Sequence, residues 1–172
     1  MAPRLLTALE REALDMGLKL RPEFVAEETS VRPPILPGVS RRFGGTVKIP
    51  RAFLRIFSKD ELRCIFLHEV AHVKFRHLLK DMAFAAVLLP FALALTWGND
   101  LFFLPSIFAV GVIVLAFHRR FEFEADRFAA DRVSREAMID VLKKVKGRYG
   151  EGGLLNKISH PGVQKRIQRL RR

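Results

Sequence analysis

Residues 58–80 read SKDELRCIFLHEVAHVKFRHLLK, and this stretch decides how the chain folds. Ser58 and Glu61 have the spacing of a capping box, in which each residue satisfies a backbone N–H group of the other at the start of a helix. Apolar residues recur through the stretch with few breaks. The pattern therefore predicts a helix that begins after Ser58 and continues to about Lys80.

The centre of this helix carries the pattern HExxH, formed by His68, Glu69 and His72. Side chains at positions i and i+4 lie on one face of a helix, so the two imidazoles can bind one cation. Glu69 lies beside them without being a ligand, where it can act as a general base on a metal-activated water. A structural helix that happens to carry these three residues is the alternative. The pattern predicts a zinc site with His68 and His72 as ligands.

A catalytic zinc needs a third protein ligand, which must come from elsewhere in the chain. The metzincin arrangement would require glycine and histidine where the sequence has Phe75 and Leu78. A second arrangement uses a glutamate on another helix, followed one turn later by an aspartate that orients a ligand histidine. Glu122 and Asp126 have that spacing. We therefore expect Glu122 to bind the metal and Asp126 to hold one of the two histidines, although a solvated acidic stripe would look the same.

Three other polar residues near these motifs are not expected to be metal ligands. Glu124 points to a different helix face from Glu122 and is expected to be a solvated charge. Cys64 precedes His68 by one turn and is expected to pack beside the site. His77 follows His72 by five residues, so on a continuous helix it would point well away from it.

Two apolar segments follow the HExxH helix. Met82–Trp97 contains 16 residues without a charge, Leu101–Phe117 contains 17, and only residues 98–100 separate them. Each is close to the minimum of about 17 residues that spans a bilayer as a helix. Basic residues flank both ends of the pair but not its tip, which by the positive-inside rule puts both termini and the active site in the cytoplasm. We expect a transmembrane hairpin over residues 82–117.

The hairpin would also bring the two motifs together. If the helices are continuous, His72 lies 25 residues before Trp97 and Glu122 lies 21 after Leu101. The difference of four residues corresponds to about 6 Å of helix. A kink at Pro90 is expected to absorb it.

The remaining chain completes a mainly α fold with a short β edge element. Thr46–Ile49 alternates as a strand and ends at Pro50, Phe121–Lys146 is expected to be one long helix, and Pro161–Arg172 a short basic one. At 172 residues the chain fits a single domain, residues 1–172, with the hairpin inserted between the two ligand helices.

The composition is apolar and strongly basic. Hydrophobic residues make up 49% of the chain, and the net charge is +12. This combination favours an integral membrane protein whose cationic surface meets anionic headgroups. Binding to nucleic acid would also explain the charge, but the Lys and Arg residues are dispersed and no nucleic-acid-binding motif accompanies them.

Three segments resemble the signatures of the HtpX and CAAX prenyl-endopeptidase family of membrane gluzincins: residues 68–72, residues 122–130 and Ser159-His160-Pro161. The resemblance covers roughly residues 44–172 and favours a compact member. It implies a zincin-like fold, one zinc ion per chain, and endopeptidase activity on protein or peptide substrates. It also implies that His160 lies near the substrate, and that the strand at Gly44–Ile49 pairs with an extended substrate.

The expected function is therefore zinc-dependent hydrolysis of peptide bonds at a membrane. His160 is expected to donate a hydrogen bond to the oxyanion of the transition state, or else to be an ordinary residue at a helix start. A membrane-anchored zinc-binding adaptor without turnover remains an alternative, and a basic nucleic-acid-binding protein is a more distant one. The sequence does not fix the oligomeric state.

Overall fold

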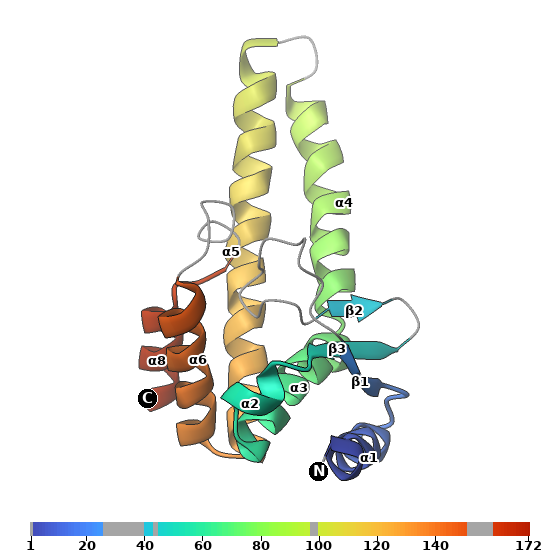
Figure 1. Ribbon diagram of the computed structural model, residues 1–172. Coiled ribbons are helices and arrows are strands. Elements are labelled where there is room, and N and C mark those ends of the chain that lie inside the picture. Colours follow the sequence, from blue (N-terminus) through green and yellow to red (C-terminus); the bar gives the residue numbers. More distant parts are fainter. Residues whose placement is uncertain (1, 26–39, 43–44, 97–99, 151–159) are drawn as a thin grey trace.

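The computed structural model describes residues 2–25, 40–42, 45–96, 100–150 and 160–172 (Figure 1). Helices dominate these residues, and a small sheet accompanies them. The helices are α1 (Ala2–Asp15), α2 (Phe53–Ile56), α3 (Lys59–Lys74), α4 (His77–Leu95), α5 (Asp100–Arg132), α6 (Arg135–Tyr149) and α8 (Val163–Arg171). The strands are β1 (Arg21–Val25), β2 (Ser40–Arg42) and β3 (Thr46–Pro50).

Helix α5 organises the molecule. Its first half pairs with α4 to form a hairpin that projects away from all other elements, and its second half packs against α3, α6 and α8 (Figure 1). The hairpin surface is apolar and open, with Leu101 77% and Phe108 74% exposed. The core lies at the other end, between α1, the sheet, α3, α6, α8 and the second half of α5. This arrangement confirms the predicted mainly α fold.

Helix α3 begins where the capping box predicts. The Ser58 backbone N–H donates to Glu61 Oε2 at 2.6 Å, and the Glu61 N–H donates to Ser58 Oγ at 3.3 Å. Ile65, Phe66 and Leu67 are buried at successive positions, so core packing surrounds the helix on several sides. Core packing therefore fixes the position of the helix that carries the HExxH pattern.

Two expected helices are each divided in the structure. The HExxH helix ends at Lys74, and α4 starts at His77 after Arg76, whose φ of 53° and ψ of 41° are left-handed. Helix α4 then continues through Pro90, so the break between the HExxH helix and the hairpin lies at Arg76. The helix expected over 121–146 likewise ends at Arg132. The Ser134 side chain accepts from Ala137 N–H at 3.0 Å and starts α6.

The β element is a three-stranded sheet in the order β1-β3-β2. Strand β3, which corresponds to the predicted strand, is central: it pairs in parallel with β1 over Thr46–Pro50 and antiparallel with β2 over Thr46–Lys48. Both sides of β3 are thus already paired over Thr46–Lys48, and an extended substrate cannot add to it there. Gly44, which the expected substrate strand included, lies outside the described residues.

We predict that Gly45→Ala destabilises the fold. Gly45 has a φ of +86°, and a Cβ atom there would collide with the backbone carbonyl of Lys19. Its own carbonyl accepts from Arg21 N–H at 2.7 Å, which starts the pairing of β1 with β3. The strained backbone and the collision should together cost about 2 kcal/mol or more, measured as a lower melting temperature.

Gly147→Ala is the matched control, because Gly147 is a helical residue of α6 whose Cβ would enter open space. That variant should be neutral or stabilised by up to about 1 kcal/mol. Equal melting temperatures for the two variants would contradict the role of Gly45.

Candidate metal centre

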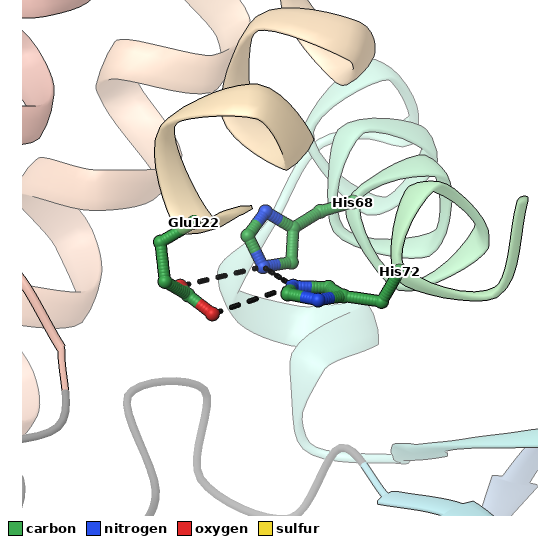
Figure 2. A group of neighbouring side chains, drawn as sticks. All are labelled: His68, His72 and Glu122. Atoms are coloured by element: carbon green, nitrogen blue, oxygen red, sulfur yellow. Dashed lines mark hydrogen bonds and ion pairs between the residues drawn. The ribbon is translucent and has the colours of Figure 1, made fainter. Parts of the chain in front are cut away.

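Two imidazoles and one carboxylate converge from two helices (Figure 2). His68 and His72 project from α3 with their Nε2 atoms 3.2 Å apart. Glu122 of α5 places Oε1 3.3 Å from His72 Nε2 and Oε2 3.8 Å from His68 Nε2. All three side chains are buried. The structure therefore brings together the three residues that the sequence nominated as metal ligands.

Asp126 supports the first histidine of this group. Its Oδ1 lies 3.0 Å from His68 Nδ1. This nitrogen is on the far side of the ring from Nε2. A carboxylate at Nδ1 favours a proton there and leaves the Nε2 lone pair free. Of the two histidines that Asp126 was expected to hold, it is His68 that it contacts.

Arg166 is a component of the site that the sequence did not indicate. It projects from α8, is only 1% exposed, and donates from Nε to Asp126 Oδ2 at 2.6 Å. Its Nη2 donates to the other oxygen of Asp126. Its Nη1 lies 3.4 Å from Glu122 Oε2. One guanidinium thus contacts both acidic residues, and only the packing of α8 on α5 places it there.

The charges of the site keep both carboxylates ionised. Burial acts to raise the pKa of Glu122, but contacts with His160 and His72 and the charge of Arg166 hold it well below its usual range. Burial also opposes ionisation of Asp126, and the charge and hydrogen bonds of Arg166 lower its pKa. An ionised Glu122 beside two imidazoles has the chemistry of a zinc ligand set.

His160 lies against the same carboxylate. Its Nδ1 is 3.4 Å from Glu122 Oε1, and the side chain remains 21% exposed. Its ring also packs edge-on against His118, whose Nδ1 is 2.8 Å from Asp81 Oδ2. His160 is therefore at the site, as the sequence motif implied. Ser159, which precedes it in that motif, lies outside the described residues.

Two other residues of α3 were singled out in the sequence. Glu69 follows His68 directly and is partly exposed. Cys64 is fully buried, and burial raises the pKa of its thiol to about 12. This complete burial agrees with a packing role for Cys64.

The expected direction of His77 is wrong, whereas Glu124 is exposed as expected and also contacts His77. His77 is 1% exposed, and its Nδ1 lies 3.0 Å from His72 Nδ1. Its Nε2 lies 3.1 Å from Glu124 Oε2. On a continuous helix His77 would point away from His72, but the break at Arg76 turns it back toward His72. No periodic pattern in the sequence marks that break.

We predict that Arg166→Met strongly destabilises the protein. The change keeps the length of the side chain but leaves Asp126 and Glu122 buried without their shared cation. Removal of one partner from a buried ion pair costs about 3–5 kcal/mol, which a melting curve would detect.

Arg169→Met on the same helix is its control, because Arg169 is exposed and lies over the Phe123 ring. That change should cost less than about 1 kcal/mol. A variant at position 166 that is as stable as the one at 169 would show that the buried guanidinium is dispensable.

Comparison with known proteins places the chain in a family. The model of peptidase family M48 matches residues 38–172. Protease HtpX of Ectopseudomonas mendocina is 27% identical, with 73% of this chain and 58% of the relative covered. Protease HtpX of Hahella chejuensis is 30% identical, with 58% and 42% covered. Protease HtpX of Stutzerimonas stutzeri is 25% identical, with 97% and 71% covered.

The chain spans only 58% and 42% of the length of the first two of these relatives. The family match, in contrast, includes the HExxH pattern, the Glu122 motif and the His160 motif. The resemblance read from those three motifs is confirmed: the chain belongs to peptidase family M48.

Proposed function

We propose that this chain is a membrane-embedded zinc endopeptidase that hydrolyses peptide bonds of protein substrates. The observation that carries the proposal is the convergence of His68, His72 and Glu122 from α3 and α5. In this reading the three residues are the metal ligands and Glu69 is the general base. Membership of a peptidase family supports it.

The spacing of the donor atoms fits zinc. Zn–N and Zn–O bonds of about 2.0–2.1 Å in a tetrahedral site place two ligand atoms about 3.3 Å apart. The two Nε2 atoms are 3.2 Å apart, and Glu122 places Oε1 3.3 Å from His72 Nε2 and Oε2 3.8 Å from His68 Nε2. Three protein ligands would leave a fourth position for water or substrate, as catalytic sites require. The donor set is thus suited to a catalytic zinc.

The chemistry would be divided among a few side chains. Zinc, when bound, would polarise the peptide carbonyl and acidify water. Glu69 would accept a proton from the attacking water and return it to the leaving amine. His160, which is partly exposed beside Glu122, would donate a hydrogen bond to the oxyanion that forms at the carbonyl.

Exposure of the hairpin supports a location in the membrane. Helices His77–Leu95 and Leu101–Arg132 are long and apolar enough to span a bilayer, and their apolar segments are almost entirely unburied. A core helix of a soluble protein would be mostly buried, so lipid is the environment that these side chains suit. We propose one metallopeptidase domain whose hairpin, residues 82–117, is inserted between the ligand helices.

The distribution of cations supports a cytoplasmic site. Basic residues flank the base of the hairpin on both helices, and none lies between residues 82 and 117. These residues are Lys74, Arg76, Lys80, Arg119 and Arg120. The positive-inside rule then puts the base of the hairpin, the metal site and both termini in the cytoplasm, next to anionic headgroups.

The metal assignment predicts different outcomes for two glutamates. Purified protein in detergent should contain about one zinc per chain and digest casein unless a chelator is added. Glu122→Ala should lose most of the zinc, because a charged ligand is removed. Glu69→Gln should retain the zinc and lose hydrolysis, because only the base is removed.

Metal analysis and casein digestion on the same preparations check both variants. Full zinc content in Glu122→Ala would refute the ligand assignment. Zinc in the wild-type protein without any turnover would favour the adaptor that the sequence left open.

The membrane assignment predicts an external hairpin tip. In a Cys64→Ala background, Asn99→Cys should react with an impermeant thiol reagent in intact cells, whereas Lys165→Cys should react only after lysis. Asn99 lies outside the described residues, and Lys165 is exposed on α8.

The same cells allow a fractionation control. The protein should stay in the membrane pellet after extraction at alkaline pH. Recovery in the soluble fraction without detergent would exclude the two-span arrangement.

A further inference from the structure

The break between α3 and α4 places His77 where a continuous helix could not. Five residues along an α-helix correspond to a rotation of about 140° away from the starting side chain. The chain instead adopts a left-handed conformation at Arg76, the only described residue other than glycine with a positive φ. This conformation is costly for an arginine, at about 1–2 kcal/mol. The result is that His77 begins α4 and its ring meets that of His72.

His77 forms a buried link between a proposed metal ligand and a carboxylate. Its Nδ1 is 3.0 Å from His72 Nδ1, and its Nε2 is 3.1 Å from Glu124 Oε2. The ring is also stacked on Phe121 with centroids 4.5 Å apart and an interplanar angle of 8°. Stacking and two polar contacts leave the imidazole a single orientation.

Only one placement of protons satisfies all of these contacts. If His72 offers the Nε2 lone pair to a metal, its proton must be on Nδ1. His72 Nδ1–H then donates to His77 Nδ1, so the proton of a neutral His77 is on Nε2. That N–H in turn donates to the Glu124 carboxylate. Hydrogen bonds are thus donated in one direction, from His72 to His77 and from His77 to Glu124, and each of the ring nitrogens in these contacts has a partner.

The two histidines of the HExxH pattern are thereby supported in parallel ways. His68 has the carboxylate of Asp126 at its Nδ1 directly. His72 has the carboxylate of Glu124 at its Nδ1 through His77. Such outer contacts fix the tautomer and orientation of a ligand histidine and raise its basicity. Helix α5 thus supplies Glu122 and both supporting carboxylates.

We propose that His77 and Glu124 are positioning residues that hold His72 in its metal-binding tautomer and orientation. This inference rests on the proposed zinc function and adds two residues that do not touch the metal. It also explains why the chain keeps a left-handed conformation at Arg76, since that conformation brings His77 into contact with His72.

The test is the zinc affinity of purified variants in detergent, measured by competition with a chelator of known affinity. His77→Phe keeps an aromatic ring against Phe121 but removes both ring nitrogens. We expect its zinc dissociation constant to rise about 10- to 100-fold, as is typical when an outer contact of a ligand is lost. His77→Gln retains an amide oxygen that can accept from His72, and it should recover at least half of that loss on a logarithmic scale.

Glu124→Ala provides a second test that does not disturb the core, because the Glu124 side chain is 45% exposed. Its zinc affinity should fall about 3- to 10-fold, less than at His77 because the contact with His72 is indirect. Asp131→Ala is the control: it removes an exposed carboxylate from the same helix, where the partner is Arg127 at 3.6 Å. That variant should bind zinc as the wild type does.

Two further readings separate positioning from packing. The melting temperature in excess chelator should be similar for His77→Phe and His77→Gln, so that the difference between them appears only with metal. The visible spectrum of the cobalt-loaded protein should shift in His77→Phe and return toward the wild-type spectrum in His77→Gln.

Each outcome has a defined consequence. Wild-type affinity in both His77→Phe and Glu124→Ala would overturn the inference and leave the proposed function intact. If His77→Phe does not fold, equal affinities for Glu124→Ala and Asp131→Ala would overturn it. A wild-type protein that binds no zinc would overturn the proposed function, and this inference with it.

Discussion

Two buried carboxylates on one face of α5 must have their negative charges compensated, and the rest of the site depends on this constraint. Glu122 and Asp126 are 3% and 1% exposed. An ionised carboxylate removed from water costs several kcal/mol unless donors or cations replace the water. Two elements that pack on this face accordingly bring one: His68 of α3 places Nδ1 against Asp126, and Arg166 of α8 contacts both carboxylates. The need to compensate these charges thus explains why segments distant in sequence meet here.

Helix α5 meets this requirement and also forms half of the apolar hairpin. Its 33 residues correspond to about 50 Å of continuous helix. The first half is apolar and exposed, whereas the second half is packed and carries the acidic residues. Because no break separates the halves, the position of the hairpin fixes the position of Glu122. A site at the base of the hairpin, close to the membrane surface that we propose, follows from this continuity.

The partner helix is built in the opposite way. A left-handed residue separates α3, which carries the histidines, from α4, which forms the other half of the hairpin. The break lets α3 cross beneath the hairpin within the core, while α4 runs beside α5 (Figure 1). Strained backbone of this kind often occurs at functional sites, where the surrounding structure maintains it. Here the left-handed conformation of Arg76 turns His77 back into contact with His72.

The sequence by itself determined the features that depend on neighbours within one or two turns of helix. The capping box at Ser58 located the start of α3, and the uncharged runs marked the hairpin. The four-residue spacings in HExxH and between Glu122 and Asp126 marked the helix faces that meet at the site. Ser134 also had the local signal of an N-cap, so the start of α6 was readable in principle. Such features are local because a helix repeats every 3.6 residues.

Only the tertiary structure decided which residues from distant parts of the chain pack against these helix faces and how the strands pair. Arg166 lies 40 residues from Asp126, and their contact depends on how α8 packs on α5. The strand expected at the edge became the centre of a sheet because β1 and β2 pair with it from separate parts of the chain. The contact between His72 and His77 required a backbone conformation that arginine rarely adopts. Pairings of this kind are set by the packing of whole elements and the compensation of buried charge, which no short-range pattern records.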